Sequence, residues 1–350
     1  MSDPSQGALP ADDANMKDRK VGLVFFGLVQ IALGGVFGLM ALFQVLIPTV
    51  QPPGLDQGSA MGAPGTVLYL VAFFASLAVV LVWLGVGSVL KRRWAQALSL
   101  VGGWLWLIFG EAGLLGMILF MPDFSEALRE GSADSTLSED QMAMFGTVMK
   151  TVMIVFQSIF LVILPGIIVL FYRSPHVRAT CESHDPEVRW TDQCPLPVLA
   201  LILLLGSGAY QCVLTGLSPF RMLPLFGTLI QGMLATVLLV GFGLILIYLT
   251  RGIYRMDLRA WWATVGLCVL FLISSIITFL RISPTEILEA MRMPEAQLET
   301  MASVYPETPT MLLFICIGGA VWLGFLWYLK RYFPESQVLA PDSSVRAPSV

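Results

Sequence analysis

Four potential metal ligands lie close together near the middle of the chain. His176, Cys181, His184 and Cys194 fall within nineteen residues and include both histidines of the chain and two of its five cysteines. A structural zinc ion prefers four nitrogen or sulfur ligands, often with a close pair two to four residues apart. Cys181 and His184 supply one such pair, but the remaining spacings fit no standard zinc motif. The segment therefore predicts either a zinc-binding, metal-responsive loop or a reduced polar hinge whose prolines end the flanking helices, and we favour the hinge.

One carboxylate lies deep inside an apolar stretch. Glu111 follows a run of apolar residues that begins near Leu98. Because an ionised carboxylate in hydrocarbon is costly, we expect Glu111 to be protonated, paired or facing a water-filled cavity. Lys150, in the next apolar stretch, is the cation most able to reach it. Glu111 and Lys150 are thus candidates for a proton-, ion- or solute-coupling pair, or for a structural contact that joins two helices.

Signatures of catalysis are absent from the sequence. It contains no G-x-S-x-G, no H-E-x-x-H, no phosphate-binding P-loop and no dinucleotide-binding glycine motif. Two histidines and 13% charged residues leave little material for acid–base chemistry. We therefore expect no enzymatic activity and no cofactor other than the zinc considered above.

The hydrophobic composition indicates that these candidate residues are held by membrane-spanning helices and their connections. With 56% hydrophobic residues and a mean hydropathy of +0.78, the chain could not cover a water-exposed surface with polar atoms. About 20 apolar residues form a helix that spans a bilayer, and eight stretches qualify: 22–47, 67–90, 97–120, 146–172, 198–214, 225–249, 261–280 and 310–329. Helices are expected because every backbone polar group must be satisfied within lipid. The sequence thus predicts an all-α, polytopic transmembrane bundle of eight helices.

Cations predict the orientation of the bundle. If the N-terminus is cytoplasmic, fifteen Lys and Arg residues lie inside and five lie outside or at outer helix ends. This bias predicts that both termini are cytoplasmic. We expect a cytoplasmic N-terminal tail (1–20), a first four-helix membrane repeat (21–173), an inter-repeat loop (174–197), a second repeat (198–331) and a cytoplasmic C-terminal tail (332–350).

Matching landmarks at a spacing of about 160–173 residues indicate an internal duplication. We expect the second and sixth helices both to open with Gly-Thr, at Gly65-Thr66 and Gly227-Thr228, and both halves carry a basic turn followed by tryptophan. Since each half has four helices, the two repeats should have the same orientation, with any shared site at their interface. Small residues let membrane helices approach closely, and the candidates for such contacts are Gly34, Gly35, Gly206 and Gly208. The outer segments 123–126 and 283–286 have capping-box spacing and predict short interfacial helices.

Two landmarks carry a resemblance to a known group of proteins. The segments Arg178–Glu182, Asp185-Pro186, Arg189–Asp192 and Cys194–Val198 resemble a loop motif of uncharacterised bacterial multi-pass membrane proteins, and Gly85–Ser88 followed by Arg92–Ala95 resembles their second landmark. The resemblance implies an eight-span inner-membrane protein without an assigned activity.

Three functions remain open. The first is a non-enzymatic membrane component or scaffold, in contact with lipid and with other membrane proteins or a second copy, and without nucleic acid. The second is a transporter that uses Glu111. The third is a metal-responsive protein that uses the inter-repeat loop.

Overall fold

Eight helices of the computed structural model are long and apolar enough to cross a membrane, as the sequence predicts. The structure describes residues 18–50, 64–120, 139–219, 221–290 and 308–333. The chain is therefore a multi-pass membrane protein with an all-α architecture, to which one short hairpin is added. The capping-box segment 123–126 and most of both tails lie outside the described residues.

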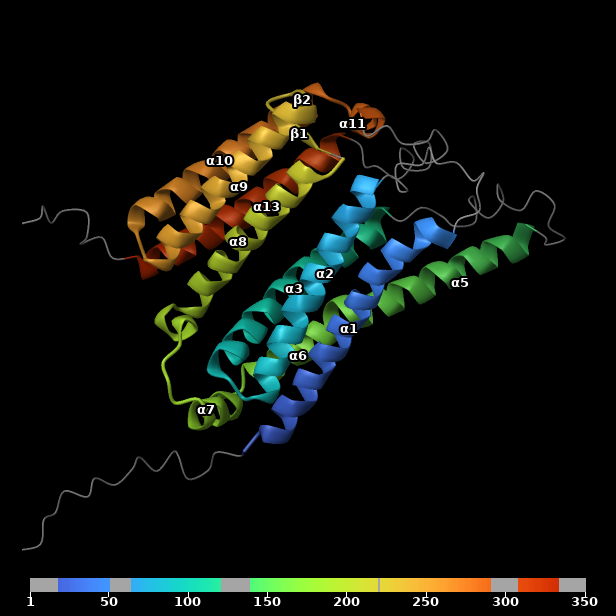
Figure 1. Ribbon diagram of the computed structural model, residues 1–350. Helices are drawn as coiled ribbons and strands as arrows, with labels where there is room; N and C mark the ends of the chain where they lie inside the picture. Colours follow the sequence, from blue (N-terminus) through green and yellow to red (C-terminus); the bar gives the residue numbers. More distant parts are fainter. Residues whose placement is uncertain (1–17, 51–63, 121–138, 220, 291–307, 334–350) are drawn as a thin grey trace, which may run out of the picture. The chain divides into compact units, whose positions relative to one another are not determined.

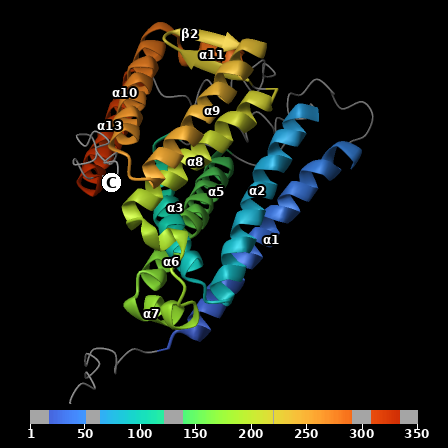
Figure 2. The same ribbon diagram turned by 60° about the vertical axis from the view of Figure 1, so that its left-hand side comes forward.

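The elements follow one another in a simple order (Figures 1 and 2). In the first half they are α1 (Lys20–Val50), α2 (Pro64–Val89), α3 (Arg93–Phe120), α5 (Glu139–Ser158), the π-helix η3 (Ile159–Ile163), α6 (Leu164–Tyr172), α7 (Pro175–His184) and η4 (Trp190–Gln193). In the second half they are α8 (Leu196–Leu217), β1 (Met222–Leu225), β2 (Thr228–Gln231), α9 (Gly232–Tyr254), α10 (Leu258–Arg281), α11 (Pro284–Ala290), α13 (Thr308–Leu329) and η5 (Lys330–Tyr332). The fifth span is longer than expected, because α8 starts at the first residue after Pro195 and covers 22 residues.

The chain divides into two compact units. The first contains residues 1–39, 75–114 and 155–193, and the second contains residues 40–74, 115–154 and 194–350. Leu23, Tyr172 and Val177, each fully buried, belong to the core of the first unit. In the second unit Trp261 is fully buried and its Nε1 donates a hydrogen bond to the carbonyl oxygen of Leu326 at 3.0 Å. These units cut across the predicted repeat boundaries, which stay a prediction.

A π-helix interrupts the fourth span. Leu164 N donates to the carbonyl oxygen of Ile159, five residues earlier, instead of to the usual partner four residues earlier. Pro165 follows, and proline has no N–H to donate. On α3, Gly110 packs directly against the carbonyl oxygen of Leu161, and a side chain at position 110 would collide with it.

A β-hairpin precedes α9, where the sequence predicted a continuous helix. Strands β1 and β2 pair antiparallel, and the two turn residues Phe226 and Gly227 have φ angles of +48° and +79°. Positive φ at both central residues is the geometry of a two-residue type I′ turn. The turn is fixed to α10, because Phe226 N donates to Ser274 Oγ at 3.0 Å and Gly227 N donates to Thr278 Oγ1 at 3.1 Å. The prediction that Gly227 opens a membrane helix was therefore wrong, since α9 begins at Gly232.

The turns after α2 and α9 have the same geometry. In the first, Lys91 has φ +56° and Arg92 N donates to the carbonyl oxygen of Gly87. In the second, Met256 has φ +56° and Asp257 N donates to the carbonyl oxygen of Gly252. A Cβ on either glycine would meet an alanine Cβ eight residues further on, Ala95 for Gly87 and Ala260 for Gly252. The two turns thus match position by position, 165 residues apart.

Candidate functional site: an apolar cavity and a buried ion-pair cluster

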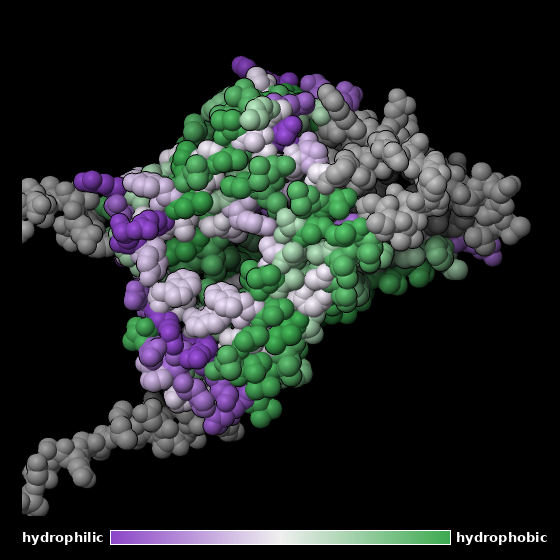
Figure 3. Space-filling view, viewed as in Figure 1, coloured by the Kyte–Doolittle hydropathy of each residue, from purple (hydrophilic) through white to green (hydrophobic). Residues whose placement is uncertain are grey.

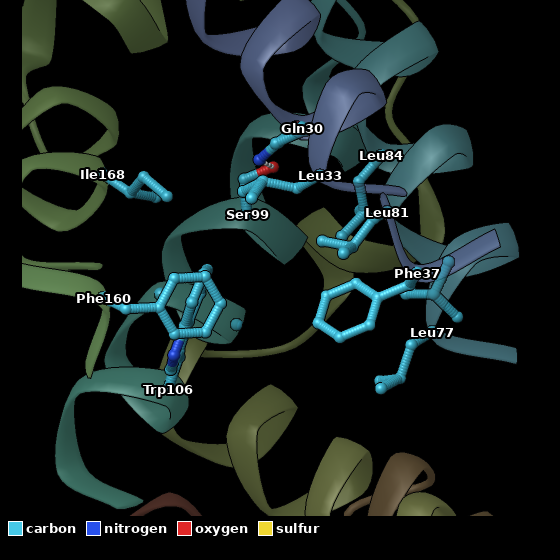
Figure 4. A pocket seen from close by; sticks show the side chains of 13 residues that line it. Gln30, Leu33, Phe37, Leu77, Leu81, Leu84, Ser99, Trp106, Phe160 and Ile168 are labelled. Carbon is cyan, nitrogen blue, oxygen red and sulfur yellow. Dashed lines mark hydrogen bonds between the residues drawn. The ribbon is translucent and has the colours of Figure 1, made fainter. Parts of the chain in front are cut away.

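The first unit contains a partly open cavity among α1, α2, α3, η3 and α6. Its volume is about 360 Å³. Most of its wall is aliphatic or aromatic, and Figure 4 shows Phe37 across the cavity from the neighbouring rings of Trp106 and Phe160. Those two rings meet edge to face, with centroids 5.1 Å apart. The cavity therefore offers a mainly apolar environment.

One part of the cavity wall is polar. Gln30 of α1 and Ser99 of α3 are 4% and 2% exposed, and Gln30 Nε2 donates to Ser99 Oγ at 3.0 Å (Figure 4). The other amide atom, Gln30 Oε1, is buried and has no hydrogen-bond partner among the described residues. An unpaired buried acceptor costs about 1–3 kcal/mol. The wall of the cavity therefore contains one unsatisfied acceptor, which is itself buried.

Further buried hydrogen bonds stabilise the first unit next to the cavity. The fully buried Tyr172 shares a hydrogen bond between its hydroxyl and Ser88 Oγ, and Ser88 Oγ also bonds to the carbonyl oxygen of Leu23. Gln96 Nε2 donates to the carbonyl oxygen of Tyr172 at 2.9 Å. These polar groups hold α1, α2, α3 and α6 together.

The second unit contains a cavity of similar size, about 350 Å³. Six of its lining residues stand 165 positions after lining residues of the first cavity: Phe242 after Leu77, Leu246 after Leu81, Thr264 after Ser99, Leu267 after Gly102, Cys268 after Gly103 and Phe271 after Trp106. Thr264 Oγ1 bonds to the carbonyl oxygen of Ala260 on its own helix, and no glutamine lines this cavity. The second cavity thus has no counterpart of the unsatisfied acceptor.

Asp185 is the centre of an ion-pair cluster in the first unit. Its carboxylate is 2% exposed and accepts hydrogen bonds from Arg189 Nη2 at 2.9 Å and Arg189 Nε at 3.4 Å. The Arg93 backbone N–H at 3.4 Å and the Arg92 guanidinium at 3.5 Å complete its partners. The Arg189 hydrogen bonds hold the pKa of the Asp185 carboxyl below its usual range. The cluster therefore fixes the basic turn after α2 to the segment that follows α7.

Ion pairs around Arg93 extend the cluster. Its guanidinium is 17% exposed and lies 3.4 Å from Asp192 and 3.6 Å from Glu182. Figure 3 shows that hydrophilic residues gather over the end of the first unit near α7, whereas hydrophobic residues cover the flanks of its helices. The first unit thus has a polar end stabilised by its own ion pairs.

Three of the four predicted metal ligands serve other contacts. Cys181 is buried in the core of the first unit, and burial raises the pKa of its thiol to about 12. His184 Nδ1 lies 2.9 Å from the carbonyl oxygen of Thr180, and Cys194 Sγ donates to the carbonyl oxygen of Tyr254 at 3.9 Å. The ring of His176 is half-buried, and its Nδ1 has no hydrogen-bond partner among the described residues. In the described part of the chain, no group of three or more His, Cys, Asp or Glu side chains could hold a metal ion.

Glu111 lies on the surface of α3. Its side chain is exposed, and it belongs to the first unit, whereas Lys150 belongs to the second. It lines neither of the two cavities. Lys150 is half-buried on α5. Their pairing stays a prediction.

Glycine packing involves one of the predicted glycines and a pair that was not predicted. A Cβ on Gly34 would lie 2.7 Å from Val82, so this glycine does let α1 approach α2. Gly208 has ordinary contact with Leu246 at 3.5 Å, whereas Gly35 and Gly206 have no described atom within 4 Å. The helices α1 and α2 also approach closely at Gly27 and Gly85, where a Cβ on either residue would lie 2.6–2.7 Å from the other's carbonyl oxygen.

The sequence reasoning missed the roles of three residues. Gln30 and Ser99 are ordinary polar residues of apolar spans, and no spacing links residue 30 to residue 99. Asp185 lies within the loop motif, but its burial depends on the distant Arg92 and Arg93. A signal existed in that loop, since an Asp four residues before an Arg is a spacing that lets the two side chains pair.

Comparison with known proteins gives no relative: no family model, no curated protein and no solved structure matches the chain. The resemblance of the loop motif therefore identifies no family.

Proposed function

We propose that the chain is a non-enzymatic component of a bacterial inner membrane that assembles with other membrane proteins or with a second copy. This proposal rests on the ion pairs that the charged residues around Asp185 form with one another. Arg92, Arg93 and Arg189 are paired with carboxylates of the same unit, and this pairing holds the segment 185–193 in one conformation. A preordered polar surface loses less conformational entropy when a partner binds.

We infer that this polar surface faces the cytoplasm together with both termini. The distribution of Lys and Arg supports this orientation. A single cysteine introduced at the exposed Glu187 should react with a membrane-impermeant maleimide only after the cells are opened. Reaction in intact cells would contradict the proposed orientation.

We also infer that the two halves arose by duplication in the same orientation. The equivalent turns at Gly87 and Gly252 and the six cavity-lining pairs support this inference, because all of them share one spacing of 165 residues. An experimental structure whose segments 77–106 and 242–271 fail to superpose would contradict it.

In-cell photo-crosslinking tests the scaffold proposal. Val188 is 69% exposed within the polar segment, and Leu170 is 73% exposed on the apolar helix α6. A photoreactive residue at 188 should form a discrete adduct that mass spectrometry identifies as a membrane protein or a second copy, whereas the same residue at 170 should label lipid. Asp185→Asn should reduce the adduct at 188. If position 188 gives no protein adduct, or if Asp185→Asn leaves the yield unchanged, the scaffold proposal fails.

A second candidate function is proton- or ion-coupled transport of a small solute, and the exposure of Glu111 favours it. An ionised carboxylate on an apolar span is costly, and ionisable residues in such spans commonly mark an ion or proton pathway. Reconstituted vesicles should then show a pH-dependent flux that Glu111→Gln abolishes and that Glu187→Gln, at a 73% exposed position outside the spans, leaves intact. Flux equal to that of protein-free vesicles, or flux unaffected by Glu111→Gln, would exclude this candidate.

A further inference from the structure

We propose that the polar end of the second unit binds the headgroup of an anionic phospholipid. The site lies where α10 begins and α13 ends, and it consists of Lys330, Arg331 and the aromatic rings that hold these two cations. The lipid phosphate would lie beside the cations, and the acyl chains would follow the apolar flanks of α10 and α13. The inference requires that the chain is embedded in a membrane, and it does not depend on the scaffold proposal.

This end of the second unit carries an excess of positive charge. The segment 251–259, which joins α9 to α10, and the short helix η5 together contain five cations and one carboxylate: Arg251, Arg255, Arg259, Lys330, Arg331 and Asp257. Figure 3 shows hydrophilic residues over this end of the unit, next to the hydrophobic flanks of its helices. Basic residues close to a membrane surface attract anionic lipids. The charge of this end therefore complements an anionic headgroup.

Two tryptophan rings hold the ammonium group of Lys330. Its Nζ lies 5.8 Å from the ring centre of Trp262 on α10 and 5.3 Å from that of Trp327 on α13, within the roughly 6 Å of a cation–π contact. The two tryptophans are 51% and 66% exposed. Exposed tryptophans at the ends of apolar spans are typical of the membrane–water interface. The contacts thus place Lys330 at the level of the phospholipid headgroups.

Two tyrosines hold the guanidinium of Arg331. Its Cζ lies 3.8 Å from the ring centre of Tyr328 and 4.8 Å from that of Tyr332, and its Nη2 donates to both hydroxyls. These phenol partners order the guanidinium without a carboxylate that would offset its charge. The Nη1 and Nε atoms carry three further N–H groups, and guanidinium N–H groups match phosphate oxygens well. Arg331 therefore offers an ordered, charged donor beside Lys330 in the chain.

The first unit treats its cations differently. Arg92 and Arg189 pair with Asp185, and Arg93 pairs with Asp192. Carboxylates thus offset the charge of these arginines, whereas aromatic rings position Lys330 and Arg331. Ordered cations lose less conformational entropy when a ligand binds. A zwitterionic headgroup brings its own cation, which the five cations of this end repel, so the site favours an anionic lipid.

Photo-labelling of the full-length protein in phosphatidylcholine vesicles tests the proposal. Two trace probes carry the same acyl chains with a diazirine near the ester, and they have a phosphatidylglycerol or a phosphatidylcholine headgroup. We expect phosphatidylglycerol to label residues 321–333 at least fivefold more than phosphatidylcholine, since fivefold corresponds to the roughly 1 kcal/mol that one basic residue near the surface contributes. Inorganic phosphate at constant ionic strength should leave this ratio unchanged. A ratio that phosphate abolishes would show that the site binds a free anion, and the proposal would fail.

Four variants make the outcome decisive. Arg331→Gln should lower the ratio at least twofold, and the addition of Lys330→Gln should bring it close to one. Trp262→Leu combined with Trp327→Leu keeps every cation but removes the rings that hold Lys330, and it should also lower the ratio at least twofold.

Arg178→Gln is the control matched to Arg331→Gln. Arg178 is 71% exposed in the first unit and lies 2.9 Å from Glu182, so its loss should leave the ratio unchanged. Equal labelling by the two probes, or a ratio that survives the loss of both cations, would overturn the proposal. So would a ratio that the double tryptophan variant leaves unchanged, or one that Arg178→Gln lowers as much as Arg331→Gln does.

Discussion

Replacement of Asp185 by Asn should loosen the segment 185–193 without unfolding the protein. The buried carboxylate accepts two hydrogen bonds from Arg189 and one from the Arg93 backbone, and hydrogen bonds to charged groups contribute about 1.5–3 kcal/mol each when well formed. Two of the three are long, at 3.4 Å, and Arg189 is 33% exposed, so solvent screening reduces the total. We expect a local loss of about 1–2 kcal/mol, which corresponds to a roughly 5–30-fold larger open population.

Amide hydrogen exchange measures this open population. When reclosing is fast, exchange rates follow the equilibrium between closed and open states. Peptides that cover 185–193 should therefore exchange roughly 5–30-fold faster in Asp185→Asn, whereas peptides from α8 should not change. Glu187→Gln is the matched control, because Glu187 also lies 2.9 Å from Arg189 Nη2 but is 73% exposed. Equal exchange in both variants would show that the buried position of Asp185 carries no special stability, and the reasoning would be refuted.

Three further predictions concern the first unit. Because the pKa of the Asp185 carboxyl is lowered in the folded protein, its stabilising effect is complete above the unfolded pKa of about 3.9 and is lost as the pH falls through the lower folded pKa. After correction for intrinsic rates, amide exchange of residues 185–193 should therefore be constant from pH 5 to 8 and rise in acid. A rise near pH 6 would show that another group is responsible. Gly85→Val should destabilise the protein by about 1–3 kcal/mol, because a Cβ there would lie 2.6 Å from the carbonyl oxygen of Gly27. Thermal unfolding measures this loss, and Gly35→Ala should leave the stability unchanged. Equal losses of stability in the two variants would contradict the packing argument. Cys181, with a pKa of about 12, should react with maleimide only after denaturation, and rapid labelling of the native protein would contradict its burial.

The sequence alone predicted the membrane class and the eight spans, because apolar length is a local property of the chain. It did not predict the hairpin before α9. Phe226 and Gly227 adopt a tight turn whose N–H groups bond to Ser274 and Thr278, and that stabilisation comes from a helix about fifty residues away. The polar residues of that helix were visible in the sequence, but their partners were not.

The candidate site was less predictable than the fold. Spacing drew attention to His176, Cys181, His184 and Cys194, but the last three have contacts of other kinds in the structure. The cavity depends on side chains from four spans that are far apart in the sequence. A cavity of this kind results from the packing of several spans, and the periodicity or motifs of any one segment do not predict it.

The π-helix at Ile159–Ile163 matters more for the side chains inside it than for those on either side. Phe160, within this segment, forms part of the cavity wall, and Gly110 rests against the backbone of Leu161. An α-helix turns about 100° per residue, so four α-helical residues cover about the same rotation as the five residues of one wide π turn. Deletion of one residue here would therefore restore regular winding and leave the flanking turns facing nearly as before. Its cost would fall on Phe160 and Leu161, which would lose their places against the cavity and against Gly110.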